Sequence, residues 1–222
     1  RLAQYQLAFD AETRLALARR LIAGKLAAQI RLLETAQAQR PDARKPLHDG
    51  IATLRGLLPK LAVAMDRDVV LGLEGAGAAA HYAALTALFP PSLRFTGRNR
   101  RPPRDPVNAC LSLGYTLLHF EAVRAAHGAG LDPLLGFYHE PAYGRESLAC
   151  DLIEPLRPRL DGWVWGLFRE RRLREHDFVE DKGACLLAKD GRQTFYAGYE
   201  YWVPPLRRYL RRECYRLANE LN

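Results

Sequence analysis

The amino-acid sequence predicts a mainly α fold for this chain of 222 residues. Apolar residues recur at the three- and four-residue spacing of helices over most of the chain, and prolines interrupt these runs at intervals. One run, ACLLA at residues 184–188, instead favours a short strand or the arm of a β-hairpin before Asp190 and Gly191. No internal repeat divides the chain, so we expect a single α-helical domain over residues 1–222.

The first half of the chain should form three helices. Residues 12–40 carry apolar side chains at helical spacing, and Asp10 suits the N-cap position. Residues 44–66 form a second amphipathic stretch, which Pro59 should kink or split. A third helix should begin near Leu71 and end near Leu88, before two prolines.

The second half begins with an arginine- and proline-rich loop, SLRFTGRNRRPPRDP, whose composition does not suit a core element. Residues 107–130 then form a long apolar helix, for which Asp105 is a suitable cap. Residues 145–158 and 161–174 should form two short helices separated at Pro158, and the last thirty residues return to helix.

Charge and composition restrict the class of protein. Lys and Arg number 33 against 25 Asp and Glu, and the net charge of +8 favours an anionic partner such as nucleic acid. Solvated surface charge is the alternative explanation. The four cysteines form no C-x-x-C pair, as is typical of reduced thiols in a cytoplasmic protein. No membrane span is expected, and an N-terminus without Met suggests part of a longer polypeptide or a deliberately shortened chain.

Two carboxylates and a histidine lie in one apolar stretch. Asp151 and Glu154 are three residues apart, so a helix would place them on one face. Burying them requires a counter-charge, which either a divalent cation or an arginine could supply. His139 precedes them across a loop and could add a nitrogen ligand. The alternative is that Arg145 or Arg157 pairs with these acids on a solvated face.

A third acid, Glu74, lies in the small and apolar segment LGLEGAGAAAHYAAL. No Lys or Arg occurs between Leu71 and Arg94. Two interpretations remain open: Glu74 is stabilised at a helix N-terminus by the helix dipole, or it coordinates a ligand.

Clustered arginines predict contact with phosphate groups. Guanidinium forks match phosphate oxygens, and such contacts hold a nucleic-acid backbone without reading its sequence. A solvated basic surface is the alternative. The candidates in the loop are Arg94, Arg98, Arg100, Arg101 and Arg104, and those on the last helix are Arg207, Arg208, Arg211 and Arg212.

Three motifs in this order resemble the CRISPR-associated spacer-acquisition integrase family, the first-numbered Cas protein. The first is G-x-E-G at residues 72–75, and the second is R-x-R-x-P-P-x-D-P-x-N at residues 98–108. The third is G-F-x-H at residues 136–139, leading into S-L-x-x-D-L-x-E-x-x-R-P at residues 147–158. The segment ARRLIAGKLAAQ also resembles the family's first long helix. The resemblance covers essentially the whole chain.

The resemblance implies a helical catalytic domain that binds Mg²⁺ or Mn²⁺. The implied metal ligands are Glu74, His139 and Glu154, and Asp151 is the additional catalytic acid. Asn108 and Tyr115 are expected to line the site or its DNA path. Family members carry an N-terminal β domain, and nothing in residues 1–222 resembles it.

The implied activity is that of a metal-dependent DNA endonuclease and integrase. It would join the 3′ ends of spacer DNA to a CRISPR repeat array by transesterification. The implied partners are prespacer and leader-repeat DNA, the second-numbered Cas protein and, for the full-length protein, a second copy of itself. A catalytically silent DNA-binding or scaffold module and an unrelated metal-dependent phosphodiesterase are the alternatives.

Overall fold

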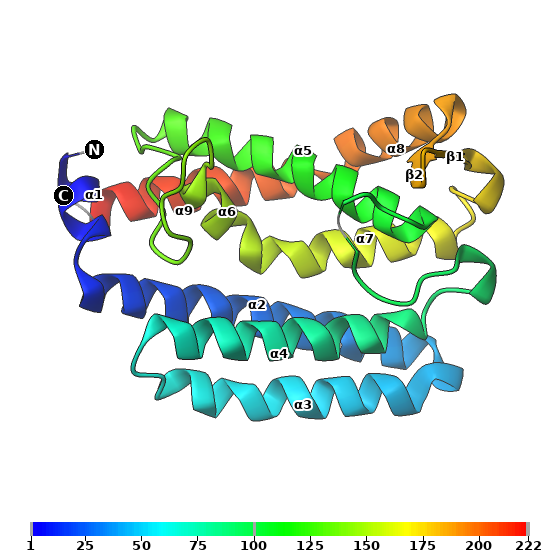
Figure 1. The fold of residues 1–222 in the computed structure, drawn as a ribbon, viewed down its shortest axis with the longest axis horizontal. Helices are drawn as coiled ribbons and strands as arrows, with labels where there is room; N and C mark the ends of the chain where they lie inside the picture. The colour runs from blue at the N-terminus through cyan, green and yellow to red at the C-terminus, as the bar shows by residue number, and fades with distance from the viewer. Residues whose placement is uncertain (1, 100, 221–222) are drawn as a thin grey trace.

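Helices dominate the computed structural model, which describes residues 2–99 and 101–220 (Figure 1). The elements are α1 (Leu2–Ala8), α2 (Ala11–Gln39), α3 (Arg44–Ala62), α4 (Arg67–Thr86), α5 (Pro106–Gly128), α6 (Ser147–Ile153), α7 (Arg157–Arg169), β1 (Phe178–Asp181), β2 (Ala184–Leu187), α8 (Lys189–Trp202) and α9 (Pro204–Glu220). The predicted mainly α fold is confirmed. Within the two described ranges, no helix has the length and apolar character that a membrane crossing requires.

The helices form two layers, which meet along α2 (Figure 1). Helices α2, α3 and α4 pack against one another in the first layer. Helices α5 to α9 and the hairpin form the second layer, in which α5 contacts α6, α7 and α9. Helix α2 contacts α7 and the short 3-10 turn η3 (Glu154–Leu156) across the junction. Side chains on that face of α2 therefore meet residues of both layers.

Helix α2 carries both apolar and polar side chains into the interior. Asp10 caps the helix as predicted, with its carboxylate accepting the Thr13 backbone N–H at 2.7 Å. Ile22 and Leu26 are buried, as the helical spacing predicts. Lys25 and Gln29 are buried on the same helix, and such residues are rarely buried without a partner.

The first layer differs from the prediction at two helices. Pro59 does not split the second helix: its missing N–H removes one backbone hydrogen bond, but α3 runs on without interruption to Ala62. Burial of Leu57 and Leu61 holds its last turn in place. Helix α4 begins at Arg67 rather than near Leu71, because Asp66 caps it by accepting the Val69 N–H at 2.8 Å.

The break between the two short helices also differs from the prediction. It falls at η3, where Pro155 occupies the first turn, and Pro158 lies in the first turn of α7. Proline is tolerated there because that turn's N–H groups have no partner within the helix. Asp151 and Glu154 consequently belong to two successive elements, α6 and η3, rather than to one continuous α-helix.

The predicted hairpin is present, with both arms. Strand β1 pairs with β2 in antiparallel register, Phe178 opposite Leu187. The turn is formed by Lys182 and Gly183, both with positive φ. Asp190 and Gly191, in contrast, lie in the first turn of α8.

Candidate functional site

A cavity of about 200 Å³ opens where α2, α4, α5 and α7 meet the loop that carries His139. Glu74, His139 and Glu154 all line it, so the structure brings the three predicted metal ligands to one place. They come from three separate elements: α4, the loop before α6, and η3. Tyr115 lines the same cavity, as predicted.

Lys25 is the counter-charge that the apolar segment around Glu74 lacks. Its Nζ lies 2.6 Å from Glu154 Oε2 and also donates to Glu74 Oε1. Lys25 and Glu154 are only 6% and 5% exposed. Glu74 lies about two turns into α4, too far from the N-terminus for the helix dipole to stabilise it, so that interpretation is wrong.

Glu154 makes a second ion pair, with Arg157 Nε 2.7 Å from its Oε1. Burial raises the pKa of the Glu154 carboxyl, but the charges of Arg157 and Lys25 outweigh it and lower that pKa to about 2. Glu154 is therefore ionised at neutral pH. Arg157 pairs with Glu154, as one of the two interpretations of the sequence predicted. The pair does not lie on a solvated face, however, because the Glu154 carboxylate is buried.

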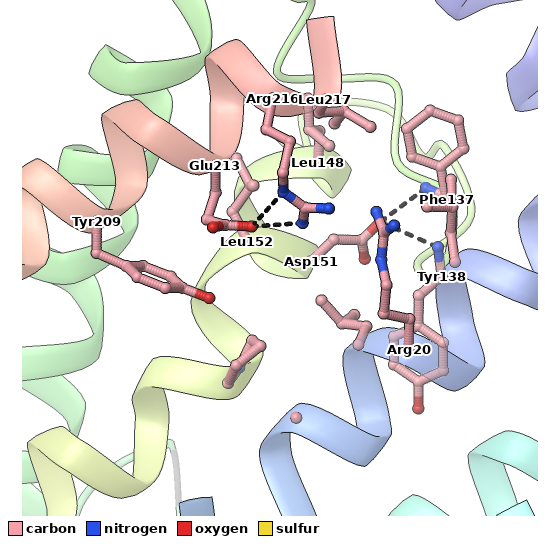
Figure 2. Close-up of a pocket in the computed structure, with 14 residues that line it drawn as sticks. Arg20, Phe137, Tyr138, Leu148, Asp151, Leu152, Tyr209, Glu213, Arg216 and Leu217 are labelled. Atoms are coloured by element: carbon pink, nitrogen blue, oxygen red, sulfur yellow. Dashed lines mark hydrogen bonds and ion pairs between the residues drawn. The ribbon is translucent and has the colours of Figure 1, made fainter. Parts of the chain in front are cut away.

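Asp151 holds the loop that carries His139. Its carboxylate accepts the backbone N–H groups of Phe137, Tyr138 and His139 at 2.7, 3.0 and 2.9 Å (Figure 2 draws the first two). The same carboxylate lies 2.7 Å from His139 Nδ1. This contact orients the imidazole and leaves Nε2 for another partner, as in many metal-binding histidines. Asp151 is thus a positioning residue.

The side chains around the cavity include suitable ligands for a divalent cation, although two of them, Glu74 and Glu154, are ion-paired with Lys25. Two carboxylates and an imidazole suit Mn²⁺ well and Mg²⁺ adequately. In residues 2–99 and 101–220, no three His, Cys, Asp or Glu side chains are placed to hold one ion as they stand. The Lys25 ammonium lies instead between Glu74 and Glu154.

A buried polar network that the sequence does not predict borders the cavity. His81 Nε2 lies 2.9 Å from Asp161 Oδ2, and the Tyr115 hydroxyl donates to Asp161 Oδ1. The Tyr82 and Tyr115 hydroxyl oxygens lie 2.7 Å apart. Burial raises the pKa of Tyr115, and Asp161 adds to this effect, so Tyr115 stays a neutral donor. His81 and Asp161 are eighty residues apart, so no local sequence pattern connects them.

Asn108 is fully buried and holds the arginine loop rather than lining the cavity. Its Oδ1 accepts from Arg98 Nη1 at 2.8 Å and from the Asn99 N–H at 3.0 Å. Its Nδ2 donates to Asp105 Oδ2 at 2.6 Å and to the Gly97 carbonyl at 2.8 Å. Asn108 therefore fixes the position of Arg98, which does line the cavity.

The predicted phosphate-binding arginines differ in their surroundings. Those exposed to solvent are Arg94, Arg101, Arg104, Arg208, Arg211 and Arg212, whereas Arg100 lies outside the described residues. Arg207 is held by Glu121 and Glu200, with Nη2 2.7 and 2.9 Å from their oxygens. This pairing gives Arg207 a structural role between α5, α8 and α9.

A family match and curated relatives agree on one family. Residues 1–201 match the family described as CRISPR associated protein Cas1. The CRISPR-associated endonuclease Cas1 1 of Thermodesulfovibrio yellowstonii is 47% identical over 156 residues, which cover 69% of this chain and 49% of that protein. This chain thus spans about half the length of that relative, and less of several Cas4–Cas1 fusions.

The fold is also found in solved structures. A casposase bound to integration product superposes with a TM-score of 0.85 at 25% identity, covering 99% of this chain and 64% of the other. A chain of a partial Cas6-RT-Cas1–Cas2 complex superposes with a TM-score of 0.90 at 24% identity, covering 99% and 68%. With motifs, family match and fold in agreement, the chain belongs to the Cas1 family of CRISPR-associated proteins.

Proposed function

We propose that this chain forms the catalytic part of a metal-dependent DNA integrase that joins spacer 3′ ends to a CRISPR repeat array. The observation that carries the proposal is the convergence of Glu74, His139 and Glu154 on one cavity. Family membership supports nuclease chemistry, because the relatives are named endonucleases. The casposase bound to integration product supports DNA joining as the reaction.

The residues present would hold a divalent cation through the carboxylates of Glu74 and Glu154 and through His139 Nε2. A bound Mg²⁺ or Mn²⁺ would supply positive charge that activates the attacking hydroxyl and stabilises the phosphate oxygens. Asp151 keeps His139 in the orientation that this requires. With water in place of a DNA 3′-hydroxyl, the same site would hydrolyse DNA.

Arg98 and Arg157 would bind the reacting phosphate. Both line the cavity, and their guanidinium groups lie 5.4 and 4.6 Å from the centre of the Tyr115 ring. Stacking on an aromatic ring limits the rotation of a guanidinium, so its N–H groups are already directed when phosphate arrives. Tyr115, whose hydroxyl is held by Asp161, thereby positions both cations.

DNA would be held outside the cavity by the exposed arginines of the loop and of α9. The proposed DNA partners are the prespacer and the leader-repeat junction. Cas2 is proposed as the protein partner, because chains with this fold are named as parts of Cas1–Cas2 complexes. Dimerisation of the full-length protein, which the family resemblance implies, and a cytoplasmic location, which the free cysteines favour, are further parts of the proposal.

The proposal is tested by strand transfer of a 3′-hydroxyl DNA end into a repeat substrate with Mn²⁺. Removing a ligand in Glu74→Ala or His139→Ala should reduce the rate at least about a hundredfold, since each would remove charge stabilisation of the transition state. His127→Ala, at an exposed histidine on α5, is the matched control. Full activity in a folded ligand variant would contradict the site. Hydrolysis of DNA without joining of DNA ends would favour an unrelated phosphodiesterase. DNA binding without either reaction would favour a catalytically silent DNA-binding module.

A further inference from the structure

Lys25 occupies the position that a catalytic cation would need. Its ammonium contacts one oxygen each of Glu74 and Glu154, and the other Glu154 oxygen is taken by Arg157. The proposed ligands are therefore already paired with protein cations. Lys25 belongs to α2, whereas the acids it bridges come from the two different layers of the fold.

Repulsion between like charges opposes having Lys25 and a divalent cation together between these acids. The Lys25 ammonium contacts both Glu74 and Glu154, so an ion bound by the same two carboxylates would lie next to it. Two cations at contact distance in a mostly buried site repel each other strongly. Lys25 has a flexible side chain and makes point contacts, so it can leave more easily than the stacked Arg157.

Gln29 offers a place for the displaced ammonium. It is four residues after Lys25 on α2, so the two side chains share one face of the helix. Gln29 is 2% exposed, lines the same cavity, and its Oε1 has no hydrogen-bond partner among the residues that the structure describes. A buried amide oxygen without a partner is unusual and destabilising.

We propose that Lys25 is a built-in competitor for the metal: it bridges Glu74 and Glu154 in the metal-free protein and moves to Gln29 Oε1 when a divalent cation binds. This rests on the proposed metal-dependent function and adds a second state to its site. Lys25 would keep the carboxylates paired, and the two layers joined, until the metal arrives. Gln29 would lower the free energy of the metal-bound state by accepting the ammonium.

Mn²⁺ binding to four chains tests this: the unaltered protein, Lys25→Met, Gln29→Met and the double variant. Calorimetry should show a Kd about tenfold lower for Lys25→Met, because the competing charge is gone. Gln29→Met should raise the Kd several-fold, since the displaced ammonium loses its acceptor. The double variant should match Lys25→Met, because Gln29 acts only through Lys25.

Thermal unfolding provides a readout that does not depend on activity. In EDTA, Lys25→Met should unfold at a lower temperature, because Glu74 and Glu154 lose their shared cation. Saturating Mn²⁺ should then raise its Tm more than that of the unaltered protein. Lys60→Met, at an exposed lysine on α3, is the control and should change neither quantity.

The outcomes separate this inference from the proposed function. A Kd for Lys25→Met equal to or above that of the unaltered protein would overturn the proposed role of Lys25. If Glu74→Ala abolishes Mn²⁺ binding in the same experiment, the proposed metal site would still stand. Absence of Glu74-dependent Mn²⁺ binding in every chain would overturn both. If Lys25→Met folds only with Mn²⁺, its refolding on metal addition supports the exchange.

Discussion

Replacing Asp151 with alanine should release the loop that carries His139. The buried carboxylate accepts three consecutive backbone N–H groups, from Phe137 to His139, and the imidazole Nδ1. Hydrogen bonds to a charged group contribute about 1.5–3 kcal/mol each, but bonds that share one acceptor are not additive. We therefore expect a loss of about 3–5 kcal/mol in the free energy of unfolding.

This loss can be measured in two ways. For a domain of this size, about 1 kcal/mol shifts Tm by roughly 2–4 °C, so Tm of Asp151→Ala should fall by at least about 6 °C. Hydrogen exchange should quicken at the amides of Phe137, Tyr138 and His139, which lose their acceptor. Asp68→Asn, at a carboxylate that is 90% exposed, is the control and should change the free energy by under about 0.5 kcal/mol.

Two results would refute the reasoning. A Tm within about 2 °C of the unaltered protein would mean that these bonds contribute little net stability. Unchanged protection of the three amides would mean that other contacts order the loop. In either case Asp151 would not be the residue that positions His139.

Three further predictions concern other parts of the molecule. Because Arg157 and Lys25 hold the pKa of Glu154 at about 2 against an ordinary 4.5, its contribution to stability in metal-free buffer should be complete above about pH 4.5 and disappear as the pH falls through 2. Glu154→Gln should flatten that part of the stability–pH curve in acid titrations. Replacing Arg101 and Arg104 with Gln should lower the slope of log K for duplex DNA against log salt by roughly 2, and an unchanged slope would mean that neither contacts phosphate. Burial raises the pKa of Cys185 to about 11 and of Cys214 to about 12, so iodoacetamide should label them at pH 8 far more slowly in the folded than in the unfolded protein.

Several features of this protein follow from local sequence alone. Helical periodicity and the capping carboxylates Asp10 and Asp105 predict elements that the structure contains, because capping and apolar spacing act within a few residues. The apolar setting of Glu74 marks this acid as unusual, but leaves open whether the helix dipole or a bound ligand stabilises it. The order of the motifs was sufficient to identify the family, which the match over residues 1–201 confirms.

Other predictions from local sequence were wrong because a neighbouring residue determined where a helix begins or ends. Helix α4 starts four residues early because Asp66 offers a cap before Leu71. The regular α-helix predicted through Asp151 and Glu154 ends at Ile153. Glu154 begins the 3-10 turn η3, whose Pro155 has no backbone N–H with which to continue the α-helix.

Only the tertiary structure decided which charges meet. Lys25 lies 49 residues from Glu74 and 129 from Glu154, and His81 lies 80 residues from Asp161. Sequence patterns determine the helices and the residue types available, because these depend on short-range propensity and spacing. The pairing of buried charges depends on how α2 packs between the two layers, and that packing brings Lys25 between the acids proposed to bind the metal.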